Sequence, residues 1–288
     1  MALFTVFGAA GFIGRHVVAT LEQVGHRIDL PPRRWVPDAG RNLGHVIFCA
    51  GVTADFRSRP YDTMEAHVSL PAGILSQGTF ESFLYLSSTR IYDGAPDGDE
   101  AASITVNPAD ASDLYNLSKL SGEALCLNHP DPAVRVARLS NVYGADMFAD
   151  DIGNANFLAG ILGEAVVRGH IDLATDPSSA KDYIDVADVA RAIVTVAQQG
   201  DERIYNIAAG RKVSHGEIAA RLQDLTGCAT TVAENAPVVD YPDISTRRIA
   251  GLFNGTGSAW SPAALTDRLP GLVSAARESW RIKEGALA

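Results

Sequence analysis

Tyr115 and Lys119 are the two residues of this sequence whose types and spacing point most directly to chemistry. A helix would place them on one face, because they lie four positions apart. A free tyrosine has a pKa of about 10 and is a poor proton donor or acceptor at neutral pH. A nearby ammonium favours the phenolate and lowers that pKa. We therefore expect an acid–base pair for a carbonyl or hydroxyl group, with a surface helix pair as the simpler alternative.

The apolar run at 82–86 ends in two hydroxyl side chains, Ser87 and Ser88. The carboxyl ends of parallel strands border the crevice in which α/β sheets bind their ligands. This arrangement strengthens the catalytic interpretation of the tyrosine and the lysine.

A glycine-rich turn begins at Gly8, directly after an apolar run at 3–7 and before a helical pattern at 12–24. In such a turn Gly8 allows the tight bend, Gly11 lets the backbone approach a pyrophosphate, and Gly14 lets helix and strand pack closely. The helix N-terminus offers free N–H groups to the phosphates. The spacing is GxxGxxG rather than GxGxxG, so an ordinary strand-to-helix turn is the alternative.

Seven motifs extend this pattern over most of the chain. They are GAAGFIG at 8–14, FCAG at 48–51, SSTRIY at 87–92, YNLSKLSGE at 115–123, RLSNVYG at 138–144, KDYIDVADV at 181–189 and IYNIAAG at 204–210. In their order and spacing the chain resembles the extended short-chain dehydrogenases/reductases, a group of NAD(P)-dependent sugar-nucleotide epimerases, dehydratases and reductases.

The resemblance implies a role for each of the three catalytic candidates. Tyr115 would be the acid–base residue. Lys119 would lower the pKa of Tyr115 and hold the nicotinamide ribose. Ser88 would hydrogen-bond the reacting oxygen, because it lies four residues before Tyr92 as the catalytic Ser or Thr of the family does; capping of the backbone is the alternative.

The two residues after Ser88 argue against one reaction of the family. Sugar 4,6-dehydratases carry an Asp-Glu pair there for proton removal and water loss, whereas this chain has Thr89 and Arg90. Neither can act as a carboxylate, so we do not expect dehydration.

The resemblance also assigns binding residues. The expected cofactor-binding residues are Gly8, Gly11, Phe12, Ile13, Gly14, Arg33, Arg34, Ala50, Gly51, Ser87, Tyr115 and Lys119. The expected substrate-binding residues are Ser88, Thr89, Asn141 and Lys181.

Several of these residues have a structural alternative. Asn141 would contact the sugar or phosphate, or else stabilise a loop. Lys181 stands where many members have an Arg near the diphosphate, or is a solvated surface charge. His67 replaces a frequent Asn behind the nicotinamide; it is a core histidine or part of a proton path. Asp182 and Asp185 are expected to brace the helix that follows.

The choice between NAD and NADP depends on the end of the second strand. NAD usually needs an acidic residue there for the ribose 2′-OH. At the aligned position stands Pro32, followed by Arg33 and Arg34, and arginine suits a 2′-phosphate. We therefore favour NADP, with NAD held through Asp29 as the alternative.

The elements that must position these residues alternate between strands and helices. We expect strands at 3–7, 27–30, 45–49, 82–86, 134–139 and 204–207, and helices at 12–24, 61–77, 112–128, 157–168, 186–199 and 214–226, the last opened by a capping box of Ser214 and Glu217. This order predicts an α/β fold of the Rossmann type, a doubly wound parallel sheet with a smaller C-terminal α/β lobe. Only about fourteen residues join the second and third strands, which is short for a helical crossover. Residues 147–156 are expected to form a loop.

The domain prediction follows the same pattern. Residues 1–145 would form the NAD(P)-binding domain, to which 183–207 return. Residues 146–182 and 208–288 would form the substrate-binding lobe.

Composition excludes several other classes of protein. The 288 residues are 47% hydrophobic, carry a net charge of −10 and have a pI near 5.1, which argues against a nucleic-acid-binding surface. Three scattered cysteines and seven histidines form no metal-ligand pattern, so we expect no metal. No run approaches ~18 apolar residues and no leader is recognisable, so we expect a cytoplasmic protein without a membrane span.

These observations predict an NAD(P)-dependent oxidoreductase that acts on a nucleotide-activated sugar. We favour hydride transfer to a 4-keto sugar with Tyr115 as the proton donor. C4 epimerisation uses the same residues and is the alternative, and a non-catalytic NAD(P)-binding sensor or scaffold is the alternative of another class. The family also implies a homodimer, formed through the helices at 61–77 and 112–128.

Overall fold

A six-stranded sheet is the centre of the first unit of the chain in the computed structural model, which describes residues 1–53, 55–148 and 157–287. The strand order is β2-β1-β3-β4-β5-β9, and every neighbouring pair runs parallel. These strands are β1 (Leu3–Phe7), β2 (Arg27–Asp29), β3 (His45–Phe48), β4 (Ser82–Ser88), β5 (Val134–Leu139) and β9 (Ile204–Ile207). The predicted Rossmann-type α/β class is confirmed.

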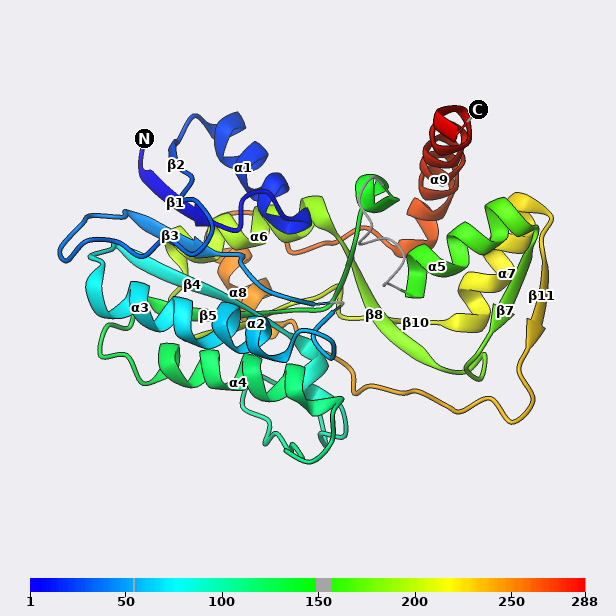
Figure 1. Cartoon of the computed structure of the whole chain (residues 1–288), viewed down its shortest axis with the longest axis horizontal. Coiled ribbons are helices and arrows are strands. Elements are labelled where there is room, and N and C mark those ends of the chain that lie inside the picture. Colours follow the sequence, from blue (N-terminus) through cyan, green and yellow to red (C-terminus); the bar gives the residue numbers. More distant parts are fainter. Residues whose placement is uncertain (54, 149–156, 288) are drawn as a thin grey trace. The chain divides into compact units, whose positions relative to one another are not determined.

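Helices cover both faces of this sheet (Figure 1). They are α1 (Phe12–Val24), α2 (Pro60–Met64), α3 (Leu70–Gln77), α4 (Asp113–Leu127), α6 (Val186–Gln199) and α8 (Arg247–Gly255). The chain passes from β1 outward to β2 and then back to β3 on the other side of β1. The loop after β1 therefore lies at the point where the strand order reverses, which is where open α/β sheets bind their ligands.

The predicted helix at 61–77 has a different internal structure. A π-helical turn over Glu65–Ser69 separates α2 from α3. Pro71 lies in the first turn of α3, where a missing N–H costs little. Such π-turns are frequent at functional sites, and this one carries His67.

The connection from β2 to β3 has no helix. The Trp35 ring stacks on Phe7 with centroids 6.1 Å apart, and Val36 packs against Gly73 of α3. The extended segment therefore packs on the face of the sheet that a crossover helix would otherwise cover, and its shortness agrees with the expectation that it holds no such helix.

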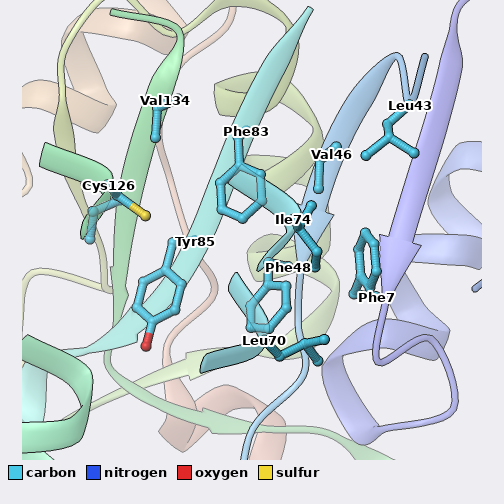
Figure 2. Close-up of a cluster of buried hydrophobic side chains, with 11 residues drawn as sticks. Phe7, Leu43, Val46, Phe48, Leu70, Ile74, Phe83, Tyr85, Cys126 and Val134 are labelled. Carbon is cyan, nitrogen blue, oxygen red and sulfur yellow. The ribbon is translucent and has the colours of Figure 1, made fainter. Parts of the chain in front are cut away.

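The core between the sheet and α3 is aromatic (Figure 2). Phe48 stacks between Phe83 and Tyr85, with ring centroids 6.1 and 5.9 Å away. The Tyr85 hydroxyl donates to the His67 carbonyl at 3.1 Å. A Cβ on Gly122 of α4 would lie 2.4 Å from that hydroxyl. This close packing fixes α4 and the π-turn against β4.

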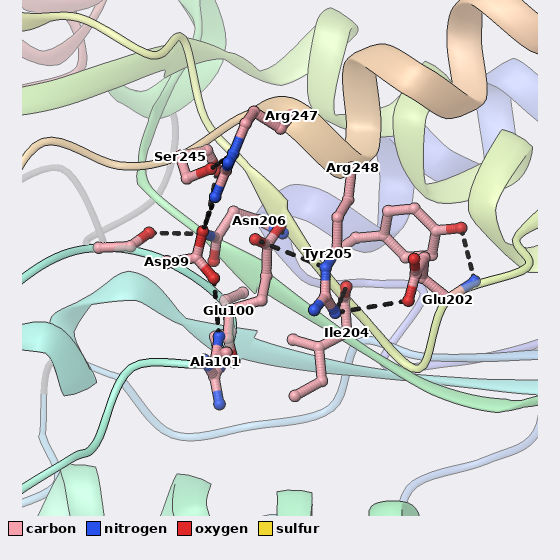
Figure 3. Close-up of polar contacts among 12 residues, drawn as sticks. Asp99, Glu100, Ala101, Glu202, Ile204, Tyr205, Asn206, Ser245, Arg247 and Arg248 are labelled. Atoms are coloured by element: carbon pink, nitrogen blue, oxygen red, sulfur yellow. Dashed lines mark hydrogen bonds and ion pairs between the residues drawn. The ribbon is translucent and has the colours of Figure 1, made fainter.

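A buried polar network joins the sheet to a late segment of the chain (Figure 3). The Asn206 amide donates to the carbonyls of Gly98 and Ser245, at 2.9 and 3.1 Å, and accepts from the Tyr92 hydroxyl at 2.8 Å. The backbone N–H of Asn206 donates to Glu100 at 3.0 Å. These bonds hold the segment that begins α8 on the first unit.

The units of the structure therefore differ from the predicted domains. The first unit is Met1–Ser140, Val186–Ala208 and Ile244–Trp260, and the second is Asn141–Asp185, Ala209–Asp243 and Ser261–Ala288. The sequence placed 244–260 in the C-terminal lobe and 141–145 in the first domain. Contacts between residues far apart in the sequence group both segments differently in the structure.

The described residues of the second unit form two small sheets and three α-helices. Strand β8 (Ala180–Asp185) pairs with β6 (Asn141–Tyr143) and β10 (Lys212–Ser214), and β7 (His170–Leu173) pairs with β11 (Ala229–Val232). The helices are α5 (Phe157–Gly163), continued by a π-turn over Glu164–Arg168, α7 (His215–Thr226) and α9 (Leu265–Leu287). Ser214 caps α7 by accepting the N–H of Glu217 at 3.1 Å, as predicted. The predicted loop at 147–156 lies largely outside the described residues; Met147 and Phe148 are buried in a 3₁₀ turn.

None of the helices in the described part of the chain is both long enough and apolar enough to cross a membrane.

Candidate active site

The glycine turn after β1 has the geometry that a pyrophosphate site needs. Gly8 has a φ of +78°, and a Cβ there would lie 2.6 Å from the Ala50 nitrogen. A Cβ on Gly14 would lie 2.2 Å from the Gly8 carbonyl oxygen. Only glycine fits at either position. The turn after β1, the start of α1 and the segment after β3 therefore pack with their backbones in direct contact.

The N-terminus of α1 is open to an anion. Gly11 is its N-cap and has no side chain to bond the first amides, and the first turn, which starts at Phe12 and Ile13, contains no acidic residue. Helix amides that lack a side-chain cap attract phosphate oxygens. The residues present therefore fit a bound dinucleotide.

The catalytic candidates of the first unit come together at the carboxyl end of β4. The Lys119 ammonium donates to the Leu86 carbonyl at 2.9 Å and lies 5.9 Å from the centre of the Tyr115 ring. Ser88 hydrogen-bonds Tyr115 and also accepts the N–H of Arg90 at 3.2 Å. The contact with Tyr115 supports the catalytic interpretation of Ser88, and the contact with Arg90 supports the capping interpretation.

The neighbouring residues complete this end of the sheet. Ser87 is buried, and its hydroxyl has no hydrogen-bond partner. A Cβ on Gly51 would lie 2.9 Å from the His67 ring and 3.5 Å from the Lys119 ammonium. The glycine at the end of the FCAG motif is therefore needed for the approach of these two side chains.

Electrostatics at Tyr115 differ from the expectation. Burial raises its pKa above the ordinary value, and the hydrogen bond from Ser88 and the charge of Arg90 oppose that rise. Burial lowers the pKa of Lys119 to about 7, although Glu123 and Cys49 act in the opposite direction. The favourable charge that acts on the pKa of Tyr115 is that of Arg90, whereas the sequence-based expectation named Lys119.

His67 is a hydrogen-bonded core histidine. Its Nε2 accepts the N–H of Val52 at 3.1 Å, so Nδ1 carries the proton and donates to Ser118 at 2.8 Å. The Ser118 hydroxyl donates in turn to the Tyr115 carbonyl at 2.7 Å. Burial lowers the pKa of His67 to about 2. The neutral ring therefore holds the start of α4 and favours the core alternative.

The charged residues near the end of β2 form two exposed pairs. Asp29 pairs with Arg41 at 3.0 Å, and that guanidinium lies 4.7 Å from the Trp35 ring. Arg34 has a φ of +63° and pairs with Asp62 at 3.1 Å. Arg33 is exposed. Sequence reasoning missed Arg41 because it lies twelve residues from its partner.

Two substrate candidates belong to the second unit. The Asn141 amide donates to the Asp182 carbonyl at 2.8 Å, which matches its structural alternative. Lys181 lies in β8 with its ammonium 5.6 Å from the Tyr241 ring. Asp182 accepts the N–H groups of Ala209 and Arg211, at 2.9 and 3.0 Å. It therefore braces the turn before β10 rather than the helix expected from sequence.

Thr89 is buried in the 3₁₀ turn that follows β4. Within the described residues, no group of three or more His, Cys, Asp or Glu side chains is placed to hold a metal ion.

A dinucleotide-type glycine turn after β1 and a Tyr-Lys pair on α4, a helix packed against the same sheet, are typical of dehydrogenase-like α/β proteins. Comparison with known proteins specifies the family. Residues 4–208 match the model of the NAD dependent epimerase/dehydratase family. The chain belongs to this family.

Individual relatives agree with this. The putative GDP-L-fucose synthase 2 of Oryza sativa subsp. japonica is 25% identical over 261 residues, 83% of this chain and 70% of that protein. The structure of MoeE5 in complex with UDP-glucuronic acid and NAD matches with a TM-score of 0.73 and 22% identity, over 96% of this chain and 99% of that one. The structure of RMD from Pseudomonas aeruginosa complexed with NADPH has a TM-score of 0.68 and 21% identity, over the same shares.

Proposed function

We propose that this chain is an NAD(P)-dependent oxidoreductase of nucleotide-activated sugars and that it reduces a 4-keto group. The observation that carries the proposal is the contact of Tyr115 with Ser88, beside Lys119, at the sheet edge that also carries the open glycine turn. The MoeE5 complex shows that a protein of this fold holds both a nucleotide sugar and NAD.

The side chains have distinct roles in this reaction. The dinucleotide, when bound, supplies the hydride. Ser88 hydrogen-bonds the carbonyl oxygen of the sugar and Tyr115 gives it a proton. The Lys119 ammonium holds the ribose next to the nicotinamide. Thr89 and Arg90 provide no carboxylate to remove a proton from the sugar, so we do not propose that the chain is a dehydratase.

NADP is the cofactor that the charges favour. Asp29, the candidate for a ribose 2′-OH, is already paired with Arg41. Arg33 is exposed, and its guanidinium suits a 2′-phosphate. The pairing of Arg34 with Asp62 leaves Arg33 as the main candidate of the two arginines.

An assay with 4-keto and 4-hydroxy UDP-sugars tests both proposals. We expect NADPH to be consumed in a one-to-one ratio with the 4-hydroxy product. The Arg33→Ala/Arg34→Ala variant should raise KM for NADPH by about 10- to 150-fold, the loss of a charge-assisted contact of ~1.5–3 kcal/mol. Its KM for NADH should stay within about threefold of the wild type, since NADH lacks the 2′-phosphate that makes this contact.

The other outcomes identify the alternatives. Interconversion of C4 epimers without net use of dinucleotide would replace the reductase by an NAD-dependent epimerase. Binding of dinucleotide without either conversion would favour the sensor or scaffold. A lower KM for NADH than for NADPH in the wild type would contradict the cofactor proposal and point to Asp29.

We also propose a homodimer formed through α2–α3 and α4. Tyr61 and Met64 on α2 and Leu125 on α4 are 89%, 37% and 36% exposed, while Leu75 and Leu127 pack against the core. Part of the apolar surface of these helices thus belongs to the core, and the exposed residues remain for a partner. Sedimentation at micromolar concentration should give twice the chain mass of 30.5 kDa; a monomer contradicts the proposal.

A further inference from the structure

Arg90 places a permanent positive charge against the ring of Tyr115. Its guanidinium carbon is 5.6 Å from the centre of that ring and 5.2 Å from the centre of the Phe56 ring, and the two rings are 5.6 Å apart. Phe56 and Tyr115 are 2% and 7% exposed. A cation this close to two largely desolvated rings interacts with both more strongly than it would in water.

The other contacts of Arg90 do not account for its charge. Nη2 lies 3.5 Å from the Ser112 carbonyl, a long hydrogen bond, and the buried Nε has no hydrogen-bond partner. Across the described residues its guanidinium is in no ion pair with a carboxylate. Arg90 is partly buried, and a charge withdrawn from water without a carboxylate partner is costly, so its position next to the tyrosine calls for a functional reason.

The groups that face Tyr115 from the surrounding elements leave Arg90 as the dependable charge. Ser88 on β4 is a neutral hydrogen-bond donor, and His67 on the π-turn is a neutral ring. Burial lowers the pKa of Lys119 on α4 to about 7, so this lysine carries only part of a charge near neutral pH. Tyr85 on β4 is buried, and burial raises its pKa. A guanidinium keeps its proton throughout this range.

We propose that Arg90 is a positioning residue for catalysis: its guanidinium, stacked on Phe56, stabilises the phenolate form of Tyr115 and so helps the phenol to give up its proton. The proposal rests on the assignment of Tyr115 as the acid–base residue. The charge of Arg90 lowers the pKa of Tyr115, which is the direction that stabilisation of the phenolate requires. The proton that leaves the phenol goes to the sugar oxygen.

Arg57 provides a matched control. Its guanidinium also lies over Phe56, 4.6 Å from the ring centre, and bonds the Ser112 hydroxyl at 2.9 Å. It is exposed to solvent and shows no contact with Tyr115. Screening by water should make its charge ineffective at the phenol.

The test titrates position 115 alone, in the full chain with 3,5-difluorotyrosine in place of Tyr115. This phenol is more acidic than tyrosine, and its ¹⁹F resonance reports phenolate formation without substrate or dinucleotide. Arg90→Gln should raise the titration midpoint by about one pH unit or more. Arg90→Lys should recover part of that shift, and Arg57→Gln should leave the midpoint within about 0.3 units of the parent.

The proposal is overturned if the midpoint of Arg90→Gln equals that of the parent. It is also overturned if Arg57→Gln shifts the midpoint as much as Arg90→Gln. If Arg90→Gln does not fold, the shift between the parent and Arg90→Lys decides, and no shift there rejects the proposal. In the unfluorinated enzyme kcat of Arg90→Gln at pH 7 should fall about tenfold with KM for the dinucleotide unchanged. If the chain does not catalyse the proposed reaction, kcat cannot be measured. The ¹⁹F titration midpoint would still test the effect of Arg90 on Tyr115.

Discussion

Replacement of Tyr115 by Phe is expected to lower kcat by about 10²–10⁴-fold, because the variant keeps the ring and loses only the proton that the phenol gives to the substrate. The ring contacts with Phe56 and His67, at 5.6 Å each, do not need the hydroxyl. Dinucleotide affinity should therefore stay within a few-fold of the wild type, since the hydroxyl serves the substrate oxygen. Steady-state kinetics and a fluorescence titration of the dinucleotide measure the two effects.

Tyr205→Phe is the matched control for that variant. Tyr205 is also a buried tyrosine of the first unit, on strand β9, but its hydroxyl accepts the N–H groups of Asp201 and Glu202 at 2.9 Å, away from the candidate site. It should lose stability and keep its kcat. Near-normal turnover by Tyr115→Phe would remove Tyr115 from the mechanism.

Replacement of Lys119 by Met is expected to reduce activity by about 10²-fold or more and, at the same time, to stabilise the fold. The activity falls because the ammonium no longer holds the ribose. The stability rises because the wild type keeps an ammonium buried, 5% exposed, where burial lowers its pKa to about 7 from 10.5. Methionine has a similar length and no charge to desolvate.

The pH dependence of this stabilisation has a definite sign. Below pH 7 both the folded and the unfolded chain carry the proton, and the folded state bears the full cost of the buried charge. Between pH 7 and 10.5 the unfolded chain binds more protons, so the wild type gains stability as the pH rises. The advantage of Lys119→Met should therefore be largest near pH 6, on the order of 2–4 kcal/mol after the lost bond to Leu86, and should decline towards pH 10.

Denaturant unfolding of both proteins at several pH values measures this difference. Lys119→Arg serves as the control, because it keeps a charge at the position and should show no such gain. A variant less stable than the wild type at pH 6 would mean that the ammonium stabilises the fold, contrary to the cost inferred from its burial.

Local sequence was sufficient for the β1–turn–α1 segment that opens the first unit. The apolar run of β1, the glycines of the following turn and the helical spacing of α1 act within about twenty residues of each other, and each excludes other conformations by itself. Gly25 ends α1 with a φ of +80°, which the sequence signals in the same local way. The helix that carries Tyr115 and Lys119 was predictable for the same reason.

The second unit was less predictable because its strands are short and pair over long distances. Strands β6 and β10 have three residues each, and they meet on β8 from positions 141–143 and 212–214. Periodicity is weak over so few residues, and these strands were absent from the sequence prediction. The placement of 244–260 on the first unit was missed likewise, because the bonds of Asn206 that hold it connect distant parts of the chain.

The sequence by itself named the candidates for the chemistry: the glycine turn, Tyr115 and Lys119 from residue type and spacing, and the role of Ser88 from the family resemblance. Only the tertiary structure decided their electrostatics. Burial depends on the surroundings of a side chain and not on its neighbours in sequence, so the low pKa of Lys119 could not be predicted from its position four residues after Tyr115. The same holds for Arg90, whose charge reaches Tyr115 because the turn after β4 folds against the first turn of α4.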